Sequence, residues 1–255
     1  MEPRWLAPDV SEPLGTWAGP IPPARGARRQ SFELASRGDR VPGELWLPDP
    51  GRPPFAVVLQ QGESGSLAAA EEDALPGWLA AGLAVASIDL PLHGGRASAK
   101  LGALLRAGLR DAEPEPLARD LAIEFARQAV LDLRRCLDAL PRLARVDAER
   151  IAYAGSGVAA ALGAHLCAQD PRLRAAVLAG AAGRLPSELD PRAALGRIAP
   201  RPLLFVDARG GRAAAAAVHA AAAEPKQVRW VDTLPPLGDP PTRAFVAGAL
   251  GLPTR

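Results

Sequence analysis

From Phe55 onward the sequence repeats one unit: an apolar run of strand length, a glycine-rich turn, and a segment whose apolar residues have helical spacing. This repetition is typical of parallel sheets, whose strands are buried on both faces and are joined by helices. It predicts an α/β fold with a mostly parallel central sheet and helices on both faces. The predicted strands are 56–60, 84–89, 151–154, 175–179, 202–206 and 228–232, and the predicted helices are 71–81, 117–140, 158–168, 212–223 and 242–250.

The first part of the chain has a different character. Residues 1–30 are rich in proline and arginine and carry Trp5 and Trp17, which predicts an extended arm without regular structure. Residues 31–36 and 41–47 alternate apolar and polar side chains around an Arg-Gly-Asp-Arg turn, which predicts an antiparallel hairpin. We therefore expect an arm at 1–30 and one domain at 31–255, with a short lid helix at 95–116.

Composition supports one large domain and excludes several classes of partner. The chain has 255 residues, and 48% of them are hydrophobic, which is enough for a substantial core. Its 30 basic and 28 acidic residues are spread along the sequence, so we expect no nucleic-acid binding. No run approaches 18 apolar residues and the start does not resemble a signal peptide, so we expect no membrane association and a cytoplasmic location. Abundant alanine with only two lysines, Lys100 and Lys226, indicates GC-rich coding of bacterial type.

The sequence offers few residues in the spacing that metal binding or redox chemistry requires. Cys136 and Cys167 lie in helical patterns without metal-ligand or disulfide-exchange spacing, so we interpret them as buried free thiols. The three histidines are scattered, and we interpret His165 and His219 as packing or surface residues. Acidic residues follow several predicted strands, but such residues are common in solvated loops. We expect no metal and no cofactor.

Three segments together resemble a known family. Residues 41–48 read Val-Pro-Gly-Glu-Leu-Trp-Leu-Pro, residues 88–94 read Ile-Asp-Leu-Pro-Leu-His-Gly, and residues 150–160 read Arg-Ile-Ala-Tyr-Ala-Gly-Ser-Gly-Val-Ala-Ala. They are similar to the opening strands, the loop after the fourth strand, and the nucleophile turn of the α/β-hydrolase superfamily. The dienelactone-hydrolase and acyl-esterase-like branches are the nearest in pattern, and the resemblance covers residues 31–252.

The resemblance implies a degenerate catalytic triad. The family motif G-x-S-x-G places a serine on a sharp turn between strand and helix. Aligned without gaps, Gly155 is the first glycine, Gly157 takes the serine position and Ala159 takes the last glycine position. The base should follow the last strand, yet no histidine occurs after His219, and Gly210 stands near the usual acid position. We therefore expect hydrolase ancestry without Ser-His-Asp hydrolysis.

The first functional hypothesis is a non-catalytic homologue that binds a small molecule in the vestigial pocket. The His-Gly pair that normally follows the first parallel strand is replaced here by a Gln-Gln-Gly-Glu sequence at 60–63. Ligands of open α/β folds bind at the carboxyl ends of the strands. The expected pocket residues are therefore Gln60, Gln61, Gly62, Glu63, His93, Ser156, Gly157 and Val158.

Three alternatives stay open. A register shifted by one residue would make Ser156 the nucleophile of a carboxylic-ester or thioester hydrolase, with His93 and Asp207 as its partners. Residues 155–160 also fit the dinucleotide fingerprint G-x-G-x-x-A, through Gly155, Gly157 and Ala160. Finally, the arm with Trp5 and Trp17 could bind a protein partner or a second copy of this chain.

Overall fold

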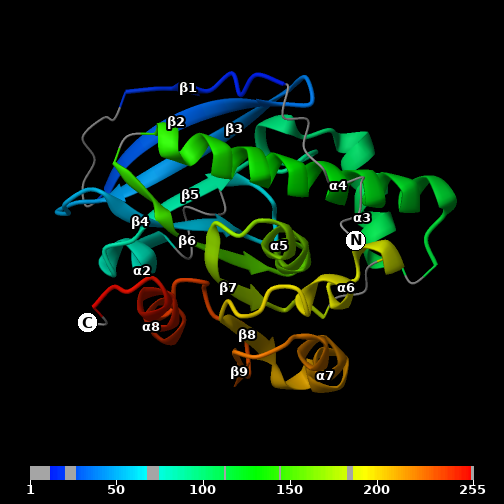
Figure 1. The fold of residues 1–255 in the computed structure, drawn as a ribbon. Coiled ribbons are helices and arrows are strands. Elements are labelled where there is room, and N and C mark those ends of the chain that lie inside the picture. The colour runs from blue at the N-terminus through cyan, green and yellow to red at the C-terminus, as the bar shows by residue number, and fades with distance from the viewer. Residues whose placement is uncertain are drawn as a thin grey trace.

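The central feature of the structure is one twisted sheet with helices packed around it (Figure 1). The computed structural model describes residues 12–20, 27–67, 75–111, 113–143, 145–182 and 186–253. These residues form nine strands in the order β1-β2-β3-β5-β4-β6-β7-β8-β9. The strands are β1 (Trp17–Ala18), β2 (Ala27–Ser36), β3 (Asp39–Pro48), β4 (Phe55–Gln61), β5 (Ala84–Ile88), β6 (Val146–Ser156), β7 (Leu173–Ala179), β8 (Leu203–Ala208) and β9 (Lys226–Val231).

The first strands pair antiparallel and the rest pair parallel. β2 and β3 form the predicted hairpin over its full length, from Ala27 opposite Pro48 to Ser36 opposite Asp39. β3 pairs antiparallel with β5, and from β5 onward every neighbouring pair is parallel. This confirms the predicted fold class. β2 begins at Ala27, four residues earlier than the hairpin prediction, because Arg29 on this strand pairs with Glu44 across the ladder.

Helices cover both faces of the sheet. On one face α4 (Pro116–Ala139) and α5 (Val158–Gln169) pack with α3 (Ala99–Arg110), α6 (Arg192–Leu195) and α7 (Arg212–Ala221). On the other face lie α2 (Leu75–Ala80) and α8 (Pro240–Ala249). Part of the helix predicted at 71–81 lies outside the described residues, and α3 is the helix expected between 95 and 116. Within the described residues, no helix is both long and apolar enough to cross a bilayer.

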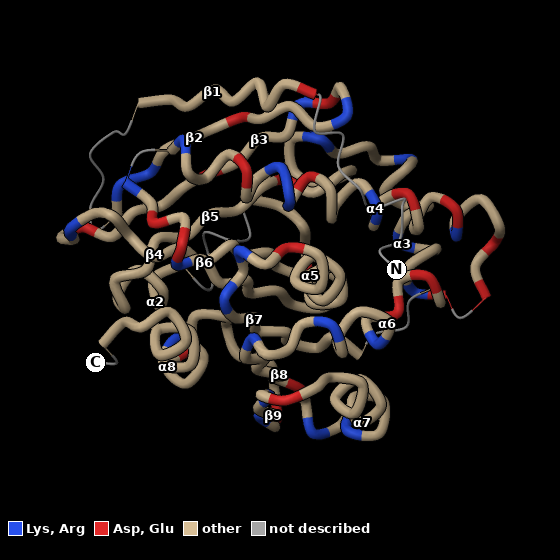
Figure 2. Tube along the Cα trace, in the orientation of Figure 1, with Lys and Arg blue, Asp and Glu red and all other residues tan. Residues whose placement is uncertain are grey.

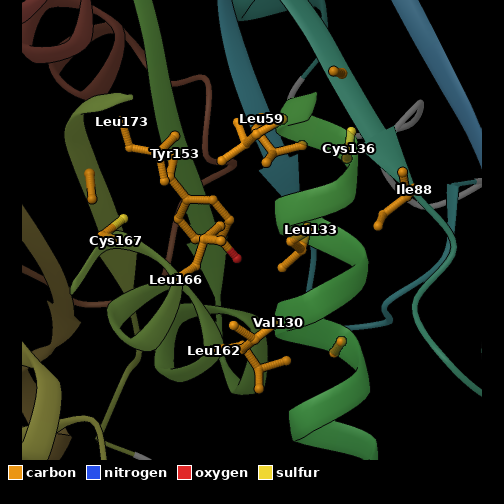
Figure 3. Close-up of a cluster of buried hydrophobic side chains, with 14 of the residues drawn as sticks. Leu59, Ile88, Val130, Leu133, Cys136, Tyr153, Leu162, Leu166, Cys167 and Leu173 are labelled. Carbon is orange, nitrogen blue, oxygen red and sulfur yellow. The ribbon is translucent and has the colours of Figure 1, made fainter. Parts of the chain in front are cut away.

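The larger core lies between α4, α5 and the sheet (Figure 3). Leucine, valine and isoleucine side chains from the strands meet those of the two helices, with Tyr153 of β6 at the centre. Cys136 and Cys167 are both buried there as free thiols, and burial raises the pKa of each to about 12. His165 on α5 is also buried, which lowers the pKa of its imidazole, so it belongs to the packing as predicted.

Part of the N-terminal segment lies along the sheet edge. β1 pairs antiparallel with β2, and Trp17 remains exposed at 58%. The guanidinium of Arg135 on α4 donates to the backbone oxygens of Glu12 and Pro13, at 3.1 and 2.9 Å, and so fastens this segment to the domain. Trp5 lies outside the described residues.

Charged residues are distributed over the described part of the molecule. In Figure 2 basic and acidic residues are interspersed along the trace.

Candidate functional site

The turn between β6 and α5 has the sharp geometry of a nucleophile elbow, and its tip is a glycine. Ser156 is the last residue of β6, Val158 is the first of α5, and Gly157 between them has φ +58° and ψ −125°. The Gly157 N–H donates to the oxygen of Ala179 on β7 at 2.8 Å, which fixes the turn to the sheet. A left-handed φ disfavours any side chain, so this backbone conformation suits glycine. The serine position of the ungapped alignment therefore coincides with the tip of the turn.

Two further glycines near this turn, Gly155 and Gly163, are explained by one tyrosine. A Cβ added at Gly155 would lie 2.8 Å from the Tyr153 ring, and one added at Gly163 on α5 would lie 2.0 Å from it. The Tyr153 hydroxyl donates to the Ala159 oxygen at 2.7 Å, and burial raises its pKa well above the usual value. Helix α5 thus approaches β6 closely because Tyr153 fills the space that glycine leaves open. Of the G-x-G-x-x-A pattern, Gly155 is thus explained by packing against Tyr153 and Gly157 by its backbone conformation.

The loop after β4 brings a carboxylate over the elbow. A Cβ built at Gly157 would meet Glu63 at 3.0 Å from Cγ and 3.2 Å from Cδ. The Glu63 side chain therefore occupies the volume that a side chain at the elbow tip would enter. Glu63 is exposed on its other side and makes no hydrogen bond or ion pair with the described residues.

His93, on the loop after β5, is already engaged. Its Nδ1 lies 2.7 Å from the Pro91 carbonyl oxygen, and its ring packs on Gly65 and on Phe125, with a centroid distance of 5.5 Å to the latter. A carbonyl oxygen only accepts hydrogen bonds, so Nδ1 carries a proton and, in the neutral ring, Nε2 is the acceptor.

The loop that carries His93 is held by buried charges. The Asp89 carboxylate, 4% exposed, accepts from the N–H groups of Leu67 and Gly95 at 2.8 and 2.7 Å. Arg96 donates to Asp132 of α4 at 2.7 Å and to Asp39 at 2.6 Å. Burial raises the pKa of Asp132, and the neighbouring Arg96 offsets part of that rise. These contacts give Asp89 and Arg96 a structural role in shaping the crevice.

Asp207 turns away from the crevice. At the end of β8 its carboxylate lies 2.7 Å from His219 Nε2 on α7, and both residues are buried. The His219 ring contacts Phe205 and Trp230, with centroid distances of 4.7 and 5.3 Å. Asp207, His93 and Ser156 are all described residues, and no hydrogen bond joins any two of them. His219, in the alanine-rich helix, is a buried partner of Asp207.

The loop after β9, where the family base is expected, brings a leucine to the elbow. Leu234 lies over Gly180, because a Cβ added at Gly180 would be 3.1 Å from Leu234 Cδ1. The same added Cβ would be 3.9 Å from the Gly157 nitrogen. Leu234, whose side chain cannot accept a proton, thus lies on the Gly180 side of the elbow.

A cavity of about 820 Å³ opens in front of the elbow. Five of the eight expected pocket residues line it: Gly62, Glu63, His93, Gly157 and Val158. The other three do not. Gln60 faces α2, where its amide oxygen accepts from the Trp78 indole at 2.6 Å, while Gln61 is buried and Ser156 ends β6.

The sequence reasoning missed the far wall of this cavity. Helix α3 contributes Leu105, Arg106, Leu109 and Arg110, and α4 contributes Phe125. The spacing of these α3 residues, at i, i+3 and i+4, was a signal that one helix face lines the crevice. A second cavity, of about 550 Å³, lies by α6 and α7 away from the elbow. No group of described His, Cys, Asp and Glu residues could hold a metal ion.

Comparison with solved structures agrees with the topology. An acetyl xylan esterase from Paenibacillus sp. R4 superposes with a TM-score of 0.70 over 93% of this chain and 90% of its own, at 18% identity. The chain has the α/β-hydrolase fold. Acetyl xylan esterase 1 from Thermoanaerobacterium sp. JW/SL YS485 gives a TM-score of 0.66 at 16% identity, covering 91% of this chain and 86% of its own. A cold-adapted esterase from an Arctic intertidal metagenomic library also gives 0.66, at 17% identity, covering 91% and 98%. No protein-family model and no curated protein matches the sequence.

Proposed function

We propose that this α/β-hydrolase-fold chain is a non-catalytic protein that binds a small organic ligand in the cavity in front of the elbow. The observation that carries the proposal is the glycine at the elbow tip, with φ +58° and the Glu63 side chain over it. A glycine has no atom that can attack a carbonyl carbon, so a covalent acyl intermediate has no place to form there.

Two further features support this proposal. The residue that approaches the elbow from the loop after β9 is Leu234, which cannot accept a proton. Asp207, the carboxylate nearest the usual acid position, is hydrogen-bonded to His219 at 2.7 Å. Meanwhile the cavity persists at a volume within the roughly 300–1,000 Å³ that small-molecule sites have. A retained cavity without a nucleophile or a base favours binding over turnover.

Ester or thioester hydrolysis is the second candidate. It is favoured by the structural neighbours, two of which are acetyl xylan esterases. It would require Ser156 to attack with help from His93, whose Nε2 is the free ring nitrogen. Direct proton transfer needs the two atoms within about 3 Å of each other.

The deciding experiment is hydrolysis of a panel of short-chain p-nitrophenyl esters and thioesters by purified protein. Wild type, Ser156→Ala and His93→Asn are assayed side by side, with Ser64→Ala as a matched hydroxyl control from the same crevice. We expect all four proteins to give the buffer rate. Turnover by wild type that disappears in Ser156→Ala but not in Ser64→Ala would overturn the binding proposal and identify a shifted nucleophile.

A further inference from the structure

Helix α3 carries two unpaired arginines into the cavity wall. Arg106 and Arg110 are four residues apart, so they lie on one helix face, and both line the cavity. Neither guanidinium makes a hydrogen bond or an ion pair with any residue that the structure describes. Both side chains are exposed, unlike those of Arg96, which pairs with Asp132, and Arg172, which pairs with Asp170. Two neighbouring guanidiniums beside a cavity, without a carboxylate partner among the described residues, are available to bind an anion from outside.

Between the arginines and the elbow the cavity wall is apolar. Leu90, Leu105 and Phe125 are buried and Leu92 and Leu109 are partly buried, and all five face the same cavity. A ligand that reaches from α3 towards the elbow must therefore cover hydrocarbon over most of its length. Removing such surface from water contributes about 25 cal/mol for each Å².

The charges of the cavity come from different walls. The positive pair belongs to α3, whereas Glu63, the carboxylate among the described lining residues, lies against Gly157 at the start of α5. An anionic group placed at the elbow would meet Glu63, and the same group placed at α3 would meet two guanidiniums. The arrangement therefore favours one orientation of a molecule that is charged at one end.

We propose that the cavity binds an amphipathic carboxylate, with its carboxylate at Arg106 and Arg110 and its aliphatic or aromatic part along Leu105, Leu109 and Phe125. This inference rests on the proposed binding function and names the chemical class of its ligand. The planar guanidinium fork matches the two oxygens of a carboxylate, which makes arginine more specific for this group than lysine.

The test is isothermal titration of the full-length protein with octanoate, octan-1-ol and octylammonium. These three ligands share a chain length and differ in head-group charge. We expect octanoate to bind about tenfold more tightly than either of the others, and only octanoate binding to weaken between 50 and 500 mM salt, because salt screens exposed charge pairs.

Variants assign the head-group contact. Arg106→Gln and Arg110→Gln should each raise the octanoate dissociation constant about threefold and together about tenfold, the range of exposed ion pairs. Lys100→Gln on the same helix, outside the cavity, is the matched control and should change it less than twofold. Leu109→Trp, which fills the cavity, should abolish binding of octanoate.

The outcomes separate this inference from the proposal on which it rests. Equal affinity for the three ligands, with no effect of the double arginine variant, would overturn the assignment of an anion and leave ligand binding in place. Octanoate binding that survives Leu109→Trp would also overturn it, because the ligand would then lie elsewhere. Absence of binding by all three ligands would overturn both proposals.

Discussion

Placing a serine at the elbow tip should cost stability without producing an esterase. Gly157→Ser places a side chain on a residue with φ +58° and ψ −125°, a sparsely populated conformation that costs an L-residue about 1–3 kcal/mol. The new Cβ would also lie 3.0 Å from Glu63 Cγ, but Glu63 is exposed and its side chain can move aside, so this contact adds little. Because about 1 kcal/mol shifts the melting temperature of a domain of this size by about 2–4 °C, we expect a decrease of roughly 2–12 °C.

The assay is differential scanning calorimetry beside p-nitrophenyl acetate hydrolysis. Gly157→Ala should lower the melting temperature as Gly157→Ser does, since the strain belongs to the backbone and not to the hydroxyl. Gly248→Ala in α8 is the control, because a Cβ there meets nothing within 4 Å, and alanine is favoured in helices by about 1 kcal/mol. Ester turnover gained by Gly157→Ser would refute the reasoning, because it would reveal a base within reach of the elbow.

Three further predictions concern groups around the site. Arg96→Met should destabilise the protein by about 3–5 kcal/mol by leaving Asp132 buried without its cation. Burial already raises the pKa of Asp132, and loss of Arg96 should raise it further. The loss of stability should therefore be smallest at about pH 3, below the usual aspartate pKa of about 3.9, and should grow towards pH 8. Urea unfolding that shows the same loss of stability at every pH would contradict this. His219→Ala should cost about 2–4 kcal/mol by orphaning Asp207, with unchanged octanoate affinity, and a change in affinity would instead connect the pair to the cavity. Cys136 and Cys167, with pKa values raised to about 12, should react with a thiol reagent such as DTNB at pH 8 only after unfolding, and prompt reaction of the folded protein would show that they are accessible.

The sheet was predictable because its parallel strands are buried on both faces. Strand β5, for example, is fully buried and apolar from Ala84 to Ile88 apart from Ser87, and it lies between a glycine turn and an aspartate. Strand ends were harder to predict. β6 begins at Val146, five residues before its apolar part. Its first five residues were not predicted as strand, because they are largely polar, resemble a loop in the sequence and are not buried in the structure. β1 has two residues and no periodicity to detect.

The parts of the candidate site that depend on residues adjacent in the sequence could be predicted. The parts that depend on the direction in which a side chain points could not. Small residues on both sides of Gly157 identified the elbow, because its turn tolerates nothing larger. Gln60 was expected in the pocket because it ends a strand, but side chains alternate between the faces of a sheet, and its position directs it to Trp78. The Asp207–His219 pair joins residues 12 apart, and their contact depends on how α7 packs against β8.

The fold of the elbow does not depend on a hydroxyl at its tip. The turn is fixed by the Gly157 hydrogen bond to Ala179 and by the fit of Tyr153 against Gly155 and Gly163. A serine at the tip would add backbone strain, so glycine is the more stable residue wherever catalysis does not require a side chain there. On the proposed binding function, the cavity in front of the elbow, with Arg106 and Arg110 on its wall, would then be kept for its ligand and not for turnover.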